Sequence, residues 1–144
     1  MTYLNVLARL LVSLIFLVSG FMKFMNYQGM VQVGAGAGLP APAISIALAG
    51  VIEVVGGLAL LIGWKVHWAS LALFLYLIPA TLIFHAAHLR DAGQGQMQMV
   101  EVLKNLAIMG GLLKFYIDAA SEAAGQVAPP VSGRVAEWPV RRAG

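Results

Sequence analysis

Long apolar stretches constrain this chain more than any other feature of its sequence. An α-helix needs roughly 20 predominantly apolar residues to cross the hydrocarbon core of a bilayer. The stretches that approach this length cover residues 4–25, 44–63, 66–84 and 101–117. We therefore predict an all-α membrane protein, an antiparallel four-helix transmembrane bundle over residues 1–117, followed by a C-terminal tail over residues 118–144.

Glycine and proline mark the turns between these stretches. Residues 34–42 hold three Gly and two Pro, which predicts the first loop. Residues 63–65 predict a tight second turn, and residues 91–95 predict the third. Each turn reverses the chain, so consecutive helices should be antiparallel.

Composition excludes several classes of protein. The chain has 144 residues, of which 60% are hydrophobic and 10% are charged, whereas soluble domains are nearer 45–50% apolar and about 25% charged. A chain this short cannot bury such an excess in a core of its own. A soluble enzyme is therefore disfavoured, and so is a nucleic-acid binder, because the nine Lys and Arg form no basic cluster. With no cysteine, the chain has no thiol pair or iron–sulfur ligand set, and redox chemistry would need a borrowed cofactor or partner.

Lys and Arg residues in the short flanking segments indicate the orientation, because they favour the cytoplasmic side. If both termini lie in the cytoplasm, that side holds six of the nine, and the outer side holds Lys23, Arg90 and Lys104. We therefore predict that both termini and the tail are cytoplasmic.

Charged residues inside the apolar stretches are the second informative feature. A Lys, Arg or Asp at a helix centre costs roughly 2.5–3.5 kcal/mol on insertion scales, so such residues usually face the bundle interior and pair. Glu53 lies near the middle of the second stretch, and Arg9 lies within the first. Nine residues separate Lys104 from Lys114, too few to cross a bilayer. Either Lys104 lies within the membrane, or the fourth stretch does not span it.

Helical spacing gathers these polar residues on shared faces. One stripe of the first stretch contains Arg9, Ser13, Phe16, Gly20 and Lys23. One face of the fourth stretch contains Glu101, Lys104, Asn105 and Ile108. The small residues around Glu53, which let neighbouring backbones approach closely, are Ala49, Gly50, Gly56 and Gly57. Together these patterns predict a polar seam that opens toward the outer face.

Two interpretations of this seam stay open. In the first, Glu53 pairs with Lys104 or Arg9 and only holds the bundle together. In the second, the outer half holds a ligand, quinone or proton site, because His titrates near neutral pH and can exchange protons with a quinone. The residues of that site would be Glu53, His85, His88, Glu101, Lys104 and Asn105.

A metal site is the weaker interpretation. His85, His88 and Glu101 are candidate ligands for zinc or iron. However, the His-x-x-His spacing is common by chance, and the sequence offers no evident fourth ligand. We therefore predict no metal site.

Several segments resemble the DoxX family. The motifs lie at residues 9–24 (RLLVSLIFLVSGFMKF), 38–40 (GLP), 49–57 (AGVIEVVGG), 80–85 (ATLIFH) and 104–111 (KNLAIMGG). The resemblance covers about residues 4–116 and implies a four-helix bacterial inner-membrane protein. By position, the characteristic polar residues of the family would be Arg9, Lys23, Glu53, His85 and Asn105.

The resemblance also implies a function, because the family takes its name from a subunit of a thiosulfate:quinone oxidoreductase. It favours an accessory or quinone-interacting subunit of a membrane redox complex, with a quinone as candidate cofactor and other membrane subunits as partners. The candidate cofactor-binding residues are Arg9, Lys23, Glu53, His85, Lys104 and Asn105. The alternative is a non-catalytic assembly or scaffold subunit, which the lack of cysteine and the arginines of the tail favour.

Overall fold

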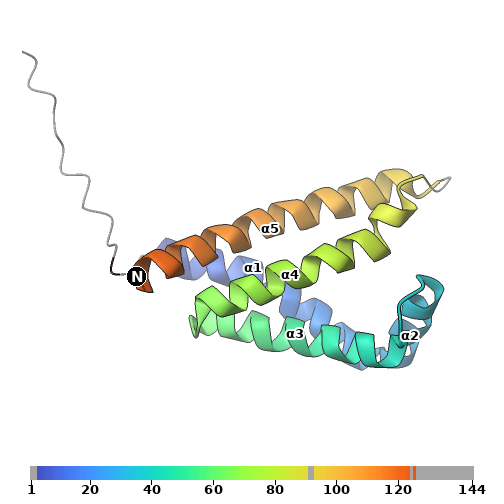
Figure 1. Cartoon of the computed structure of the whole chain (residues 1–144), viewed down its shortest axis with the longest axis horizontal. Coiled ribbons are helices and arrows are strands. Elements are labelled where there is room, and N and C mark those ends of the chain that lie inside the picture. Colours follow the sequence, from blue (N-terminus) through green and yellow to red (C-terminus); the bar gives the residue numbers. More distant parts are fainter. Residues whose placement is uncertain (1–2, 91–92, 124, 126–144) are drawn as a thin grey trace, which may run out of the picture.

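The computed structural model describes residues 3–90, 93–123 and 125, and every regular element among them is helical. The elements are α1 (Tyr3–Met25), α2 (Tyr27–Gly36), α3 (Pro42–Ile62), α4 (Val66–Phe84), the short 3₁₀ helix η1 (Ala86–His88) and α5 (Gly95–Ala123). The four long helices run antiparallel in chain order, and α2 lies across one end (Figure 1). The predicted all-α four-helix architecture is confirmed. We call the end that carries α2 and η1 the α2 end, and the opposite end, with the turn between α3 and α4, the Gly63 end.

Helices that could span a membrane form most of the bundle. By length and composition they are Tyr3–Met25, Pro42–Ile62 and Val66–His88. The 29-residue α5 is long enough, but it is less apolar. Its charged residues are Glu101, Lys104, Lys114, Asp118 and Glu122. The predicted fourth stretch therefore lies in a helix that returns to the Gly63 end but carries more charge than the other three.

The fourth helix is also longer than predicted. It begins at Gly95 and continues through residues 118–123, which the sequence assigned to the tail. Residues 124 and 126–144 of the predicted tail lie outside the described residues.

The first loop is shorter than predicted, because α2 occupies Tyr27–Gly36. The glycines of this segment predicted a loop from their low helix propensity. Gly34, however, is buried against Ile46 of α3 and Leu39, and this packing outweighs the propensity. The loop is confined to residues 37–41, where Gly38 has a left-handed φ of 76°.

Glycines set the distance between α1 and α3. A Cβ added to Gly20 of α1 would lie 2.8 Å from Cγ2 of Val54 and 3.1 Å from the carbonyl oxygen of Gly50. A Cβ added to Gly50 would lie 2.8 Å from the ring of Phe24. The close approach that the small residues predicted is therefore confirmed at Gly50, and it fixes which side chains of the two helices meet.

The helix pair α1/α3 meets the pair α4/α5 mainly toward the Gly63 end. There Gly111 of α5 lies against Val12 of α1, and Gly56 of α3 lies against Leu73 of α4. The buried apolar core comprises Phe16, Ala59, Leu60, Ala69, Leu73, Leu77 and Leu112. Toward the α2 end the two pairs diverge (Figure 1), which leaves room for a cavity between them.

We predict that Gly20→Ala destabilises the fold, because the new methyl group would meet backbone as well as side-chain atoms. Overpacking of this kind costs about 1–3 kcal/mol. The matched control is Gly110→Ala in α5, where nothing lies within 4 Å of an added Cβ. Thermal unfolding in mild detergent should show a lower midpoint for Gly20→Ala and an equal or higher midpoint for Gly110→Ala. Equal stability of the two variants would contradict the close approach.

Candidate functional site

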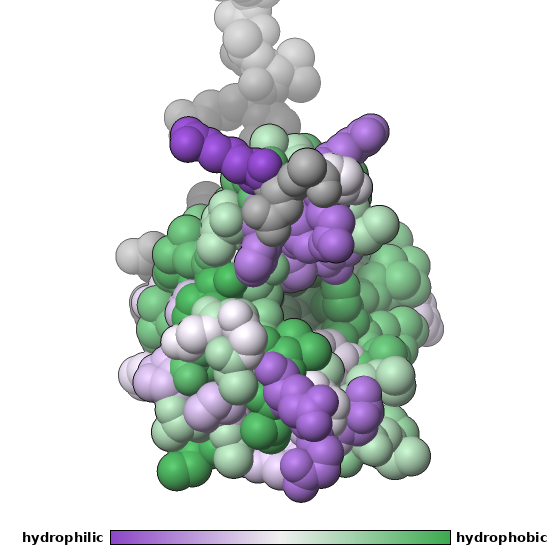
Figure 2. Space-filling model, turned by 90° about the vertical axis from the view of Figure 1, so that its right-hand side faces the viewer, coloured by the Kyte–Doolittle hydropathy of each residue, from purple (hydrophilic) through white to green (hydrophobic). Residues whose placement is uncertain are grey.

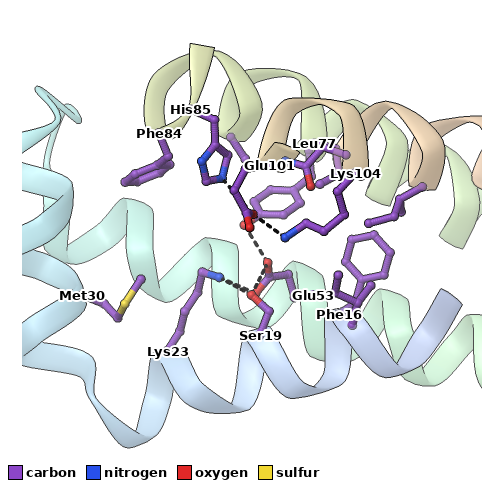
Figure 3. Close-up of a pocket in the computed structure, with 15 residues that line it drawn as sticks. Phe16, Ser19, Lys23, Met30, Glu53, Leu77, Phe84, His85, Glu101 and Lys104 are labelled. Carbon is purple, nitrogen blue, oxygen red and sulfur yellow. Dashed lines mark hydrogen bonds and ion pairs between the residues drawn. The ribbon is translucent and has the colours of Figure 1, made fainter. Parts of the chain in front are cut away.

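A cavity of about 290 Å³ lies between the two helix pairs, toward the α2 end. Figure 2 shows this end of the molecule, with hydrophilic residues above and below a hollow near the middle of the face and hydrophobic residues beside it. The lining residues, drawn in Figure 3, are Ile15, Phe16, Ser19, Lys23, Met30, Glu53, Tyr76, Leu77, Ala80, Phe84, His85, Glu101, Lys104, Asn105 and Ile108. The cavity therefore combines an apolar wall with a set of ionisable and amide side chains.

A buried ion pair between Lys23 and Glu53 forms one wall of the cavity. Nζ of Lys23 lies 2.7 Å from Oε2 of Glu53, and their side chains are only 11% and 6% exposed. One of the two interpretations of the sequence paired Glu53 with Lys104 or Arg9, and that choice of partner is wrong because Lys23 takes the place. Lys23 takes this place because it lies one turn beyond Gly20, at the close contact of α1 with α3.

Two hydroxyl groups complete the surroundings of the carboxylate. Ser19 Oγ donates a hydrogen bond of 3.1 Å to Oε1 of Glu53, and Tyr76 OH donates one of 2.8 Å to the same oxygen. Lys23 also donates to Ser19 Oγ at 2.8 Å. The network thus joins α1, α3 and α4. Sequence reasoning missed Ser19 and Tyr76, although Ser19 lies four residues before Lys23 on one helix face.

A second, more exposed polar group lies across the cavity, on α5 and the end of α4 (Figure 3). Lys104 forms an ion pair with Glu101, one turn before it on α5. Nε2 of His85 lies 4.0 Å from Oε2 of Glu101, and Nδ1 of His85 lies 2.8 Å from Oε1 of Gln98. The side chains of His85, Glu101 and Lys104 are 26%, 33% and 42% exposed. These groups can therefore exchange partners more readily than the buried Lys23–Glu53 pair.

Asn105 lies deeper on the same face of α5. Its Nδ2 donates a 3.0 Å hydrogen bond to Oγ1 of Thr81, which in turn donates one of 2.6 Å to the carbonyl oxygen of Leu77. Asn105 and Thr81 are buried. Thr81 thereby holds the amide of Asn105 in place on the cavity wall.

Arg9 and His88 lie apart from this cavity. Arg9 is buried at the Gly63 end, where its guanidinium packs against the turn at Gly63. It lines a separate cavity of about 50 Å³, together with Asp118 and Glu122. His88, in η1, does not line the larger cavity. The structure therefore brings together five of the six predicted cofactor-binding residues, but not Arg9.

The three candidate metal ligands are not assembled into one site. His85 and Glu101 approach each other, but His88 does not join them at the cavity. Over residues 3–90 and 93–123, no group of three or more His, Cys, Asp or Glu side chains is placed to hold a metal ion.

The outer surface of the bundle indicates which class of protein this is. Large apolar side chains such as Val18, Val55 and Leu82 are more than half exposed on the outside of the bundle, as lipid contact requires. Together with three helices that are long and apolar enough to cross a bilayer, this surface defines a polytopic α-helical membrane protein. The DoxX family model matches residues 4–86, more than half of the chain. The chain therefore belongs to the DoxX family.

The chain is similar to two inner membrane proteins. It is 29% identical to inner membrane protein YphA of Escherichia coli (strain K12) over 110 residues, which cover 76% of this chain and 79% of that relative. It is 27% identical to inner membrane protein YqjF of the same organism over 106 residues, which cover 74% of this chain and 76% of that relative. No solved structure gives a significant match. The chain is a DoxX-family inner membrane protein.

We predict that Lys23→Met is strongly destabilising, because it leaves the buried carboxylate of Glu53 without its ammonium partner. Breaking a buried pair from one side costs about 3–5 kcal/mol. The double variant Lys23→Met/Glu53→Gln should be more stable than Lys23→Met alone, since no unpaired charge remains. Thermal unfolding of the single and double variants in mild detergent measures this coupling.

The control for these substitutions of Lys23 and Glu53 is Lys114→Met. Lys114 pairs with Asp118, but its side chain is 69% exposed, and exposed pairs contribute at most about 1 kcal/mol. If Lys23→Met were no more destabilising than Lys114→Met, the Lys23–Glu53 pair would not have the structural role assigned to it.

Proposed function

We propose that this chain is a quinone-binding subunit of a membrane redox complex and that the quinone head group occupies the cavity between the helix pairs. One observation carries the proposal: a cavity of about 290 Å³ inside a membrane-embedded bundle is lined by apolar side chains and by hydrogen-bond donors from both helix pairs. Ligand sites are commonly such mostly apolar cavities with a few convergent polar groups.

The chemistry of the walls suits a quinone head group, which is a flat apolar ring with two carbonyl acceptors. Phe16, Leu77 and Ile108 offer apolar surface for the ring. The ammonium of Lys104 and the imidazole of His85 are donors for the carbonyl oxygens. We assign these two residues to the head group because their side chains are partly exposed and their present partners can be exchanged.

The Lys23–Glu53 pair has a different role in this proposal. Glu53 already accepts hydrogen bonds from Lys23, Ser19 and Tyr76, so little of its hydrogen-bonding capacity is left for a ligand. The pair forms a fixed wall against which the head group lies. Arg9, at the opposite end of the bundle, belongs to the helix packing there.

Reduction of a quinone to a quinol takes up two electrons and two protons. The electrons come from an electron-carrying cofactor of a partner subunit. The protons reach the carbonyl oxygens through His85, because an imidazole can both accept and donate a proton and this side chain is partly exposed at the cavity. The resulting quinol carries two hydroxyl groups, and Glu101 is an acceptor for one of them.

Substitution of Lys104 should weaken quinone binding. The probe is a benzoquinone with a single isoprene unit, titrated calorimetrically into the purified protein in mild detergent. A hydrogen bond to a charged group contributes about 1.5–3 kcal/mol, so Lys104→Met should raise the dissociation constant by about tenfold or more. Lys114→Met removes a lysine of the same helix that also pairs with a carboxylate, and binding should be unchanged.

Absence of binding to the wild-type protein would overturn the quinone proposal. It would favour the scaffold role, in which the polar seam serves only the fold. Equal binding by both lysine variants would place the quinone elsewhere on the molecule.

We further propose that both termini lie in the cytoplasm and that the cavity opens toward the opposite side of the inner membrane. The antiparallel α5 returns to the end of the bundle where α1 begins (Figure 1). A fluorescent protein fused after Gly144 should therefore fluoresce, while alkaline phosphatase at the same position should be inactive. Fusions after Leu89, at the α2 end, should show the reverse. An active phosphatase at both positions would mean that α5 does not cross.

A further inference from the structure

An apolar groove of about 310 Å³ lies between α3 and α4 at the α2 end, on the outside of the bundle. Leu48 and Ile52 line it from α3, and Pro79 and Ile83 line it from α4. Leu48 is 56% exposed, so in a bilayer this groove faces the lipid chains. It lies where the helix pairs diverge, as does the polar cavity (Figure 1).

The groove and the polar cavity are separated only by a shared wall. Tyr76, Ala80 and Phe84 line both, and so does Lys23 from the opposite side. The three residues of α4 are spaced by four, so they form one stripe along the helix. The small Ala80 lies between the two aromatic residues on this stripe.

Other apolar grooves on the described part of the chain do not reach the cavity. A groove nearer the Gly63 end is lined by residues such as Val55, Trp68 and Ala72. Another is lined by residues of α1 and α3 such as Val18 and Leu58. Neither shares a lining residue with the polar cavity. Ordinary lipid contact explains them, whereas the α3/α4 groove shares four lining residues with a candidate ligand site.

We infer that the α3/α4 groove holds the isoprenoid tail of the quinone and is the path by which the head group enters the cavity from the lipid. This inference rests on the proposed function. A cavity of about 290 Å³ is at the lower limit of ligand pockets, which hold roughly 300–1,000 Å³, so a long isoprenoid chain must leave it. His85, Glu101 and Lys104 line the cavity with partly exposed side chains, and a chain that left past them would expose apolar surface to water. The groove instead keeps the tail among lipid chains.

The test compares quinones with one and with several isoprene units on a variant that narrows the groove. Ala49 lines the groove but not the polar cavity, so Ala49→Phe should leave binding of the short quinone unchanged. Because each buried methylene contributes to affinity, loss of only a few contacts should weaken binding of the long quinone about tenfold. The matched control, Ala72→Phe, adds the same bulk to the groove nearer the Gly63 end and should bind both quinones as the wild type does.

The outcomes separate the two proposals. If the wild-type protein binds neither quinone, the proposed function fails and the tail path fails with it. If both quinones bind and Ala49→Phe affects neither, the function stands and the tail path is overturned. Retained binding of the short quinone shows that Ala49→Phe is folded.

A second measurement on the wild-type protein needs no substitution. A long-chain quinone with a photoreactive group on its tail should label residues 48–52 of α3 or 79–83 of α4. Labelling confined to α5 or to the outer face of α1 would overturn the inference.

Discussion

A buried ammonium–carboxylate contact, between Lys23 and Glu53, is the constraint on which the rest of the bundle depends. In a membrane, leaving either charge without a partner would raise the free energy of the folded protein strongly. The contact forms because Gly20 and Gly50 let α1 and α3 approach until the two side chains meet at 2.7 Å. Once paired, they fix the register of the two helices. Ser19 and Tyr76 then donate hydrogen bonds to the other carboxylate oxygen, and Tyr76 attaches α4 to the pair.

The cavity follows from where the helix pairs touch. Apolar packing around Leu60 and Leu73 joins α1/α3 to α4/α5 toward the Gly63 end, and the pairs separate toward the α2 end (Figure 1). The space between them is lined on one side by the fixed ion pair and on the other by the more exposed Glu101 and Lys104 of α5. This asymmetry gives the two ion pairs different roles: one maintains the fold, and the other is available to a ligand.

The sequence was a good guide to features that depend on local pattern. The stretch 66–84 coincides with α4, and the stripe from Arg9 to Lys23 is buried as its spacing indicated.

The sequence was a poor guide to features that depend on tertiary contact. The partner of Glu53 is decided by the glycine contact of α1 with α3, and α2 is stabilised by the packing of Gly34 against Ile46. Tyr76 carries no charge, so nothing in its sequence context marked it as a neighbour of Glu53. Arg9 shares a helix face with Lys23 but lies at the other end of the bundle. Two residues on one helix face can be far apart along the helix axis, so a shared face does not place them in one site. That the remaining five residues line one cavity is an observation, and their role in binding a quinone stays a prediction.

The central claim is that the cavity beside the Lys23–Glu53 pair receives the head group of a membrane quinone. Its most direct test is purification of the full chain from native membranes in mild detergent, followed by mass spectrometry of the small molecules that remain bound. The account predicts an isoprenoid quinone that stays with the protein and is displaced by an excess of a short-tailed quinone. Recovery of phospholipid alone, or of a quinone that the short-tailed competitor does not displace, would contradict it.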